Sequence, residues 1–145
     1  MYELDRAEAE AVLREQEIGR LGMYDEAEDR VYVVPISYVY HDGAVEFHSA
    51  PGLKLELLRA HPKGVCFQVD RISDVDDWRS VVGWGQFEEV TDSWERQVVL
   101  QRFGQSLIRG PLRDHQNIGR AGARGVGETV YRLRLTELSG KAESA

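Results

Sequence analysis

The chain has 145 residues, of which 42% are hydrophobic and 30% charged, and its formal net charge is −7. This length predicts a single domain over residues 1–145, with a core large enough to fold without disulfide bonds or a structural metal ion. The acidic balance argues against general nucleic-acid binding. The single cysteine, Cys66, excludes an internal disulfide, and no apolar run suits a membrane span or signal peptide. We therefore expect a cytoplasmic protein with no membrane or nucleic-acid partner.

The first elements expected are a helix and a strand. Asp5 and Glu8 form a capping-box pattern, which opens a helix that ends near Gln16. Apolar and polar residues then alternate over 18–24, with the period of a half-buried strand.

The stretch 31–60 is expected to organise the rest of the chain. Residues 31–40 are almost all β-branched or aromatic and predict a strand. Pro35 cannot donate a ladder hydrogen bond, so this strand should be an edge, carry a bulge or face a ligand. Asp42-Gly43 favours a tight turn, and a second strand follows over 45–48.

A short helix is expected after the loop 49–52, because apolar residues fall at helical spacing between 53 and 58. Its first N–H groups lack intrahelical partners, and Lys54 lies in the same turn. Together they could hold an anion such as a phosphate. The alternative is a solvated surface lysine beside an ordinary turn.

The second half predicts more strands and one long helix. Gly83 and Gly85 are expected at a bulge or a close approach, and Asp92 with Glu95 caps the helix. In chain order we expect strands over 64–72 and 78–90, a helix from 92 to about 108, a flexible Gly/Arg-rich loop over 109–127, a strand over 129–138 and a tail over 139–145.

Closely spaced strands with two or three helices predict a small antiparallel barrel with helices across its openings. The four histidines have no ligand-type spacing, so no metal site is expected. There is no nucleophile elbow and no P-loop pattern. His48 is open to three interpretations: ring contact with a cofactor, a hydrogen bond to a backbone carbonyl, or haem ligation.

Two segments carry a resemblance to a known family. YVVPISYVYHDG (32–43) and FHSAPGLK (47–54) resemble the pyridoxamine-5'-phosphate-oxidase-like flavoproteins, nearest to the nitroimidazole-resistance (Nim-type) branch. The resemblance implies a mainly β fold with flanking helices, a six- to seven-stranded antiparallel split barrel. It also implies FMN as cofactor and a homodimer with the flavin at its interface. The ending RLTELSGKAESA lacks the Trp-Pro-Arg-Leu ending of the vitamin-making oxidase, which argues against pyridoxamine-phosphate oxidation.

The resemblance further implies an FMN-dependent oxidoreductase. Electrons would pass from a reduced nicotinamide to a small planar acceptor of nitroaromatic or quinone type. Two alternatives are a protein that binds flavin, deazaflavin or haem without turnover, and an apo dimer with a regulatory role.

Family position also implies the site. Ser49 and Lys54 would hold the phosphate, 34–37 would line the isoalloxazine, and His48 is the candidate for a catalytic role. Arg79 and Ser80 would line the cofactor, unless they are ordinary alternating strand residues. The complete implied cofactor-binding set is Val34, Pro35, Ile36, Ser37, His48, Ser49, Lys54, Leu55, Arg79 and Ser80.

Overall fold

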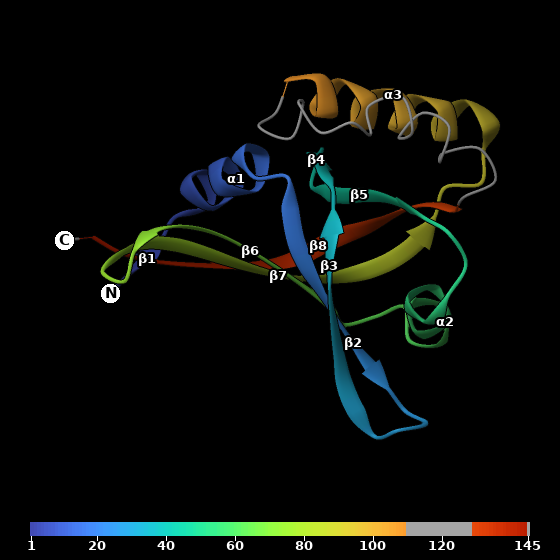
Figure 1. Cartoon of the computed structure of the whole chain (residues 1–145), viewed down its shortest axis with the longest axis horizontal. Helices are drawn as coiled ribbons and strands as arrows, with labels where there is room; N and C mark the ends of the chain where they lie inside the picture. Colours follow the sequence, from blue (N-terminus) through green and yellow to red (C-terminus); the bar gives the residue numbers. More distant parts are fainter. Residues whose placement is uncertain (110–128, 145) are drawn as a thin grey trace.

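One antiparallel sheet of eight strands and three helices make up the part of the chain that the computed structural model describes (Figure 1). The backbone is described for residues 1–109 and 129–144, and the side chains for 1–105 and 129–144. The elements are β1 (Tyr2–Leu4), α1 (Arg6–Glu15), β2 (Ile18–Asp25), β3 (Arg30–Ser37), β4 (Val39–His41), β5 (Ala44–Ser49), α2 (Leu53–Ala60), β6 (Val65–Asp74), β7 (Asp77–Glu89), α3 (Ser93–Arg109) and β8 (Thr129–Glu143).

The strand order is β3-β2-β6-β7-β8-β5-β4, with β1 paired to β8. β3 and β4 lie at opposite ends of this order, yet only Tyr38 separates them in the chain. The sheet therefore curls until its edges meet at one corner, without closing. This confirms the predicted mainly β, antiparallel split barrel. There are eight strands rather than six or seven, because 2–4 adds a strand and the predicted strand 31–40 breaks at Tyr38.

The predicted tail over 139–145 is wrong for residues 139–143. These residues continue β8, where Ser139 pairs with Val82 and Glu143 with Trp78 of β7. The buried positions here are the small residues Gly140 and Ala142, so the segment lacks a visible apolar alternation. A side chain at Gly140 would meet Leu4, which explains why the position is small. The predicted loop 109–127 lies outside the described residues, except Arg109, which ends α3.

Two predicted backbone features are confirmed. Asp42 and Gly43 have φ values of 50° and 74°, as a tight hairpin turn requires. The register of β7 against β8 shifts between Trp84 and Gly85. A Cβ at Gly85 would overlap the backbone carbonyl of Arg134, so this position is a close approach of two backbones.

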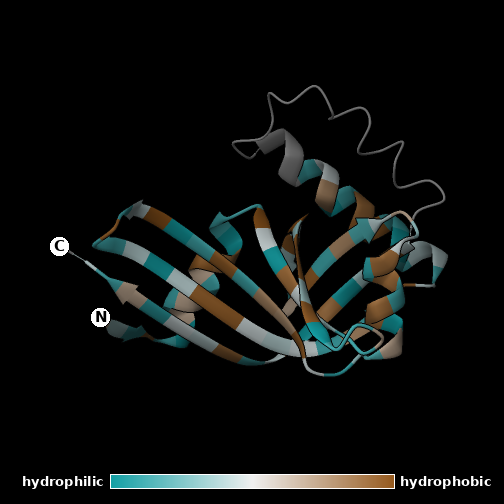
Figure 2. Cartoon of the chain, turned by 60° about the horizontal axis from the view of Figure 1, so that its bottom comes forward, coloured by the Kyte–Doolittle hydropathy of each residue, from teal (hydrophilic) through white to brown (hydrophobic). Residues whose placement is uncertain are grey.

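The core lies inside the curled sheet. Hydrophilic and hydrophobic residues alternate along the strands in Figure 2, so one face points inward and the other outward. Apolar side chains from the strands, from α1 and from α2 share one cluster, whereas α3 covers a second, smaller one of Val90, Val99 and Val130. Over the described residues, no helix is long and apolar enough to cross a lipid bilayer.

Candidate functional site

The site is built at the point where two strands part. In the β4–β5 hairpin, Val39 pairs with Glu46 and His41 with Ala44. Continuing that register would set Ser37 opposite His48, and 36 opposite 49. Instead β3 pairs with β2, where Ser37 lies opposite Ile18. β3 and β5 therefore diverge beyond Tyr38. The predicted segments 34–37 and 48–49 lie on the two sides of this split.

The loop beyond the split leads into an uncapped helix. Gly52 is the N-cap residue of α2, and it has no side chain with which to cap the first N–H groups. The Ser49 hydroxyl donates to the neighbouring carbonyl of Ala50 at 3.1 Å. Lys54 lies half-buried in the first turn of α2, and the exposed Glu56 follows it two residues later in the same turn. N–H groups that no side chain caps, beside a lysine, form a local environment that suits a phosphate.

Strand β3 confirms the prediction of an edge strand at Pro35, since β3 pairs only with β2 among the described strands. Ile36 is buried, and Val34 packs against the core cluster, so both side chains point inward. Pro35 and Ser37 are exposed on the outer face. Only these two could offer side-chain contact outside the barrel, whereas Val34 and Ile36 could offer backbone groups.

Two predicted residues face away from the outer surface of the split. Leu55 is 1% exposed and belongs to the barrel core. The ring of His48 lies edge-on to Phe103 of α3, with centroids 4.4 Å apart. His48 thus shares a face with Glu46, beneath α3. Its catalytic role stays a prediction.

Arg79 and Ser80 are not brought to the Ser49–Lys54 loop within one chain. Ser49 pairs with Thr129 of β8, whereas Ser80 pairs with Lys141. These two positions on β8 are 12 residues apart, about 40 Å along the strand. Arg79 points toward α1, and its guanidinium group lies 3.9 Å from the carboxylate of Glu8 in that helix.

Ser80 points to the outer face and joins a polar row there. Its hydroxyl accepts a hydrogen bond from Gln68 at 3.1 Å, and Gln68 also donates to Asp70 at 2.9 Å. Arg20 lies 3.3 Å from Asp70 and pairs in register with Pro35 of β3. The row therefore runs from Ser80 across β6 and β2 to the strand that borders the split.

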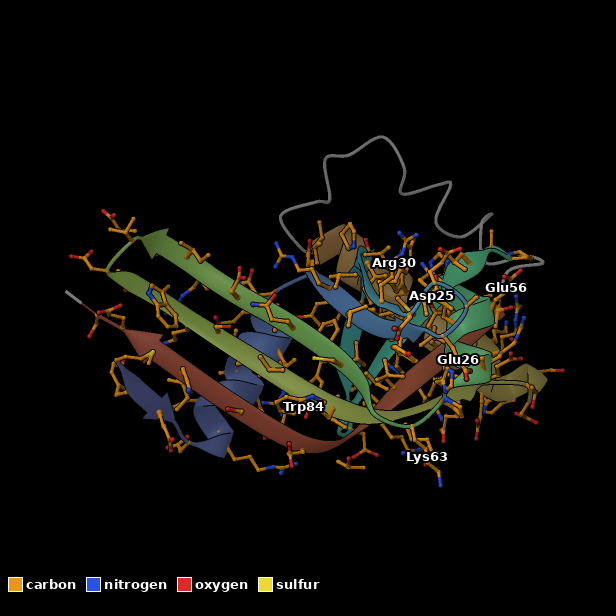
Figure 3. The ribbon with its side chains drawn as sticks, turned by 90° about the horizontal axis from the view of Figure 1, so that it is seen from below. Asp25, Glu26, Arg30, Glu56, Lys63 and Trp84 are labelled. Carbon is orange, nitrogen blue, oxygen red and sulfur yellow. The ribbon has the colours of Figure 1, made fainter. Side chains whose placement is uncertain are left out.

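Figure 3 shows the end of β2 and β3 that lies away from the split. Asp25, Glu26 and Arg30 lie at the turn between β2 and β3, beside Glu56 of α2, while Trp84 lies on β7 away from them. Asp25 is buried there, and its carboxylate accepts from the backbone N–H of Glu28 at 3.3 Å. This carboxylate fixes the turn and lies apart from the split.

A charged group under α3 was missed from the sequence. Glu46 is 1% exposed and receives two hydrogen bonds from Arg102, at 2.8 and 2.9 Å. Arg132 lies 3.5 Å from the same carboxylate. The hydrogen bond from Arg102 to Glu46 raises the pKa of Arg102. In the sequence, Glu46 occupies a polar position of an alternating strand, which predicts solvent exposure, and no local signal reveals that α3 covers it.

An open antiparallel sheet that parts beside an uncapped helix defines the class of split-barrel proteins. The family model described as pyridoxamine 5'-phosphate oxidase matches residues 5–142, and the chain belongs to this family. Among the described residues, no group of three His, Cys, Asp or Glu side chains is arranged to hold a metal ion.

Solved structures share this fold, and one curated protein is similar in sequence over part of the chain. A FAD-binding protein from Mesorhizobium loti has a TM-score of 0.80 and 29% identity, covering 99% of this chain and 98% of that one. A putative 5-nitroimidazole antibiotic resistance protein from Bacteroides thetaiotaomicron has a TM-score of 0.76 and 18% identity, covering 97% and 86%. An uncharacterized protein of Rhizobium meliloti is 30% identical over 87 residues, 60% of this chain, and the match spans only 56% of that protein.

Proposed function

We propose that this protein binds FMN at the split between β3 and β5. The observation that carries the proposal is the uncapped N-terminus of α2, with Lys54 in its first turn, directly after Ser49 at the split. The family assignment supports a flavin, and the similar Mesorhizobium loti structure is a FAD-binding protein. Ser49, Lys54 and the first N–H groups of α2 would hold the phosphate.

The ring system would lie along β3. Pro35 and Ser37 present side chains on the outer face, and this edge strand offers the backbone groups that β2 does not use. When bound, the flavin supplies the redox chemistry, and the protein supplies binding and orientation. Arg79 and Ser80 would contribute only from a second subunit, since they lie far from Ser49 in one chain.

The proposed activity is electron transfer from a reduced nicotinamide to a planar acceptor such as a nitroaromatic or a quinone. The similarity to a putative nitroimidazole resistance protein supports this class of acceptor. A flavin-carrying protein without turnover is the second candidate. It is favoured by the position of His48 under α3, which leaves the outer side of the split without this acid–base candidate.

The protein is further proposed to act as a homodimer. The outer face of β3 and β2 exposes Tyr24, Val31 and Val33, and Val33 is 59% exposed. Exposed apolar side chains gathered on one sheet face are typical of a protein–protein interface. A second copy would cover this face and would complete a site shared between subunits.

The phosphate assignment is tested with Lys54→Ala. Loss of a charge-assisted contact is expected to weaken FMN binding roughly tenfold to a hundredfold and to reduce the preference for FMN over riboflavin. Lys63→Ala is the matched control, since Lys63 follows the same helix and has no ion pair among the described residues. Unchanged FMN affinity in Lys54→Ala would remove the phosphate from this loop.

Turnover is tested anaerobically on the FMN-loaded protein. The bound flavin is reduced with NADPH or dithionite, mixed with a nitroimidazole or a quinone, and followed by its absorbance. Reoxidation faster than that of free FMN supports the oxidoreductase. Reoxidation at the rate of free FMN with every acceptor would support the flavin carrier.

The dimer is tested by sedimentation of Val33→Asp. A carboxylate on the outer face should shift the protein toward monomer, because its burial would be unfavourable. Val75→Asp is the control, since Val75 is 87% exposed in the β6–β7 turn and not on this face. A monomeric parent protein at micromolar concentration would contradict the proposal directly.

A further inference from the structure

A cavity of about 270 Å³ lies between α3, the β4–β5 hairpin and β8. It lies on the face of β5 that carries Glu46, opposite the barrel core and separate from the outer face of β3. Its lining includes Asp42, Glu46, Trp94, Glu95, Arg132 and Arg134. These residues combine cations, carboxylates and one large aromatic ring.

Two arginines in the cavity have donors to offer. The side chain of Arg132 is 13% exposed, and its nearest carboxylate oxygens, on Glu46, Glu88 and Glu95, are 3.5, 3.6 and 3.8 Å away. These distances are long for charge-assisted hydrogen bonds. Arg134 donates from Nε to Glu88 at 2.9 Å, and its side chain is 54% exposed, so its guanidinium group is accessible to a ligand. Guanidinium groups with spare donors suit phosphate oxygens.

The remaining lining groups suit the rest of a nucleotide. Trp94 is 72% exposed at the cavity, an unusual exposure for so large an aromatic side chain. A base can stack on such a ring. Asp42 and Glu95 bring carboxylate oxygens, which accept hydrogen bonds from ribose hydroxyls. With Arg102, which also lines the cavity, the three lining arginines match the three lining carboxylates in number, so a simple anion or a bare cation fits this cavity less well.

We propose that this cavity binds an adenosine diphosphate group, with its phosphates at Arg132 and Arg134, its ribose near Asp42 or Glu95, and its base on Trp94. Such a group could come from the second half of a FAD molecule or from a reduced nicotinamide dinucleotide. Glu46 precedes Ser49 by three residues on β5, about 10 Å along the strand. A dinucleotide anchored at the Ser49–Lys54 loop can span that length. Only this choice of source rests on the proposed flavin function.

The direct test is calorimetric titration of the full chain with ADP. Arg134→Gln should weaken ADP binding roughly tenfold to a hundredfold, because a charged donor is lost. Trp94→Ala should weaken it about tenfold through lost stacking. Both side chains are largely exposed, so both variants should keep the far-UV circular dichroism of the parent.

Arg71→Gln is the matched control. Arg71 is similarly exposed and lies 3.4 Å from one carboxylate, that of Glu15, on another part of the molecule. ADP affinity should be unchanged in this variant. Absence of ADP binding to the parent, or equal ADP affinity in the parent, Arg134→Gln and Trp94→Ala, would overturn the proposal.

The source of the group is separated by comparing ligands. A loss of FAD affinity with FMN affinity retained in Trp94→Ala and Arg134→Gln would assign the cavity to FAD. A loss of NADPH affinity with both flavins unaffected would assign it to the nicotinamide dinucleotide. Equal losses for FMN and FAD would overturn the adenosine assignment. A parent protein that binds ADP but neither flavin would keep the cavity assignment and refute the proposed flavin function instead.

Discussion

Helices α1 and α3 cover neighbouring parts of the same curled sheet, but they are attached to it by different forces (Figure 1). α1 inserts Ala9, Val12 and Leu13 into the main core, each at most 2% exposed. Within the described side chains, α3 covers a much smaller apolar cluster and adds the buried ion pair between Arg102 and Glu46. In this part of the chain, one sheet therefore holds one helix mainly by apolar burial and another by a charge pair together with a few apolar contacts.

The ion pair between Arg102 and Glu46 stabilises the protein only while both partners are present. Removing a carboxylate from water is costly, and the two hydrogen bonds from Arg102 offset that cost only while both partners are present. An apolar anchor such as Leu13 has no such dependence on a single partner. The comparison therefore predicts different responses when single side chains are removed.

Glu46→Ala should give the largest effect. It leaves Arg102 and Arg132 without their shared buried carboxylate, and should lower the free energy of unfolding by about 3–5 kcal/mol in urea denaturation. Glu15→Ala is the control, because its pair with Arg71 is half-exposed and should contribute below about 1 kcal/mol. Equal losses in the two variants would mean that burial adds nothing to the Glu46 pair.

Leu13→Ala should come next. Truncating a fully buried leucine removes apolar contacts and leaves a cavity, so the free energy of unfolding should fall by about 3 kcal/mol. Val99→Ala, in the small cluster under α3, should cost only about 1.5 kcal/mol, from the two carbons removed. A larger loss for Val99→Ala than for Leu13→Ala would reverse the comparison and make α3 the apolar-anchored helix.

The helix caps should give the smallest effects. Asp5 accepts from the Glu8 backbone at 2.8 Å in α1, and Asp92 accepts from the Glu95 backbone at 2.9 Å at the start of α3. Asp5→Ala and Asp92→Ala should each destabilise the protein by about 1 kcal/mol, as N-cap losses do. Thermal unfolding of both variants checks this. A much larger loss for one cap would show that its helix depends on local structure more than on packing.

The caps and α1 could be predicted because their causes are local. Asp5 with Glu8 is a pattern within four residues, and α1 follows its apolar period to Glu15. The end of β8 could not be predicted, because Gly140 and Ala142 are small for a reason that lies in β1 and α1. Strand β1 was missed for the same cause, since three residues gain their structure only by pairing with that distant end.

The features of the candidate site also differ in whether their causes are local in the sequence. The Ser49–Lys54 loop and the edge position of Pro35 could be inferred from neighbouring residues, and the structure places both beside the split. The separation of Ser80 from Ser49 depends on the register of β8, which no short stretch of sequence encodes. Glu46 looked like a solvent-facing residue because the sequence does not reveal where α3 docks.

Pro35 also affects whether copies of this chain can aggregate by pairing their exposed strand edges. β3 and β4 are the two ends of the strand order, and an exposed strand edge is a template for aggregation. β4 has three residues, too few to recruit a foreign strand effectively. β3 has eight, with exposed valines at 31 and 33, but its proline removes one donor from the row. The same residue that borders the proposed cofactor site therefore also limits amyloid-like growth from the longer edge.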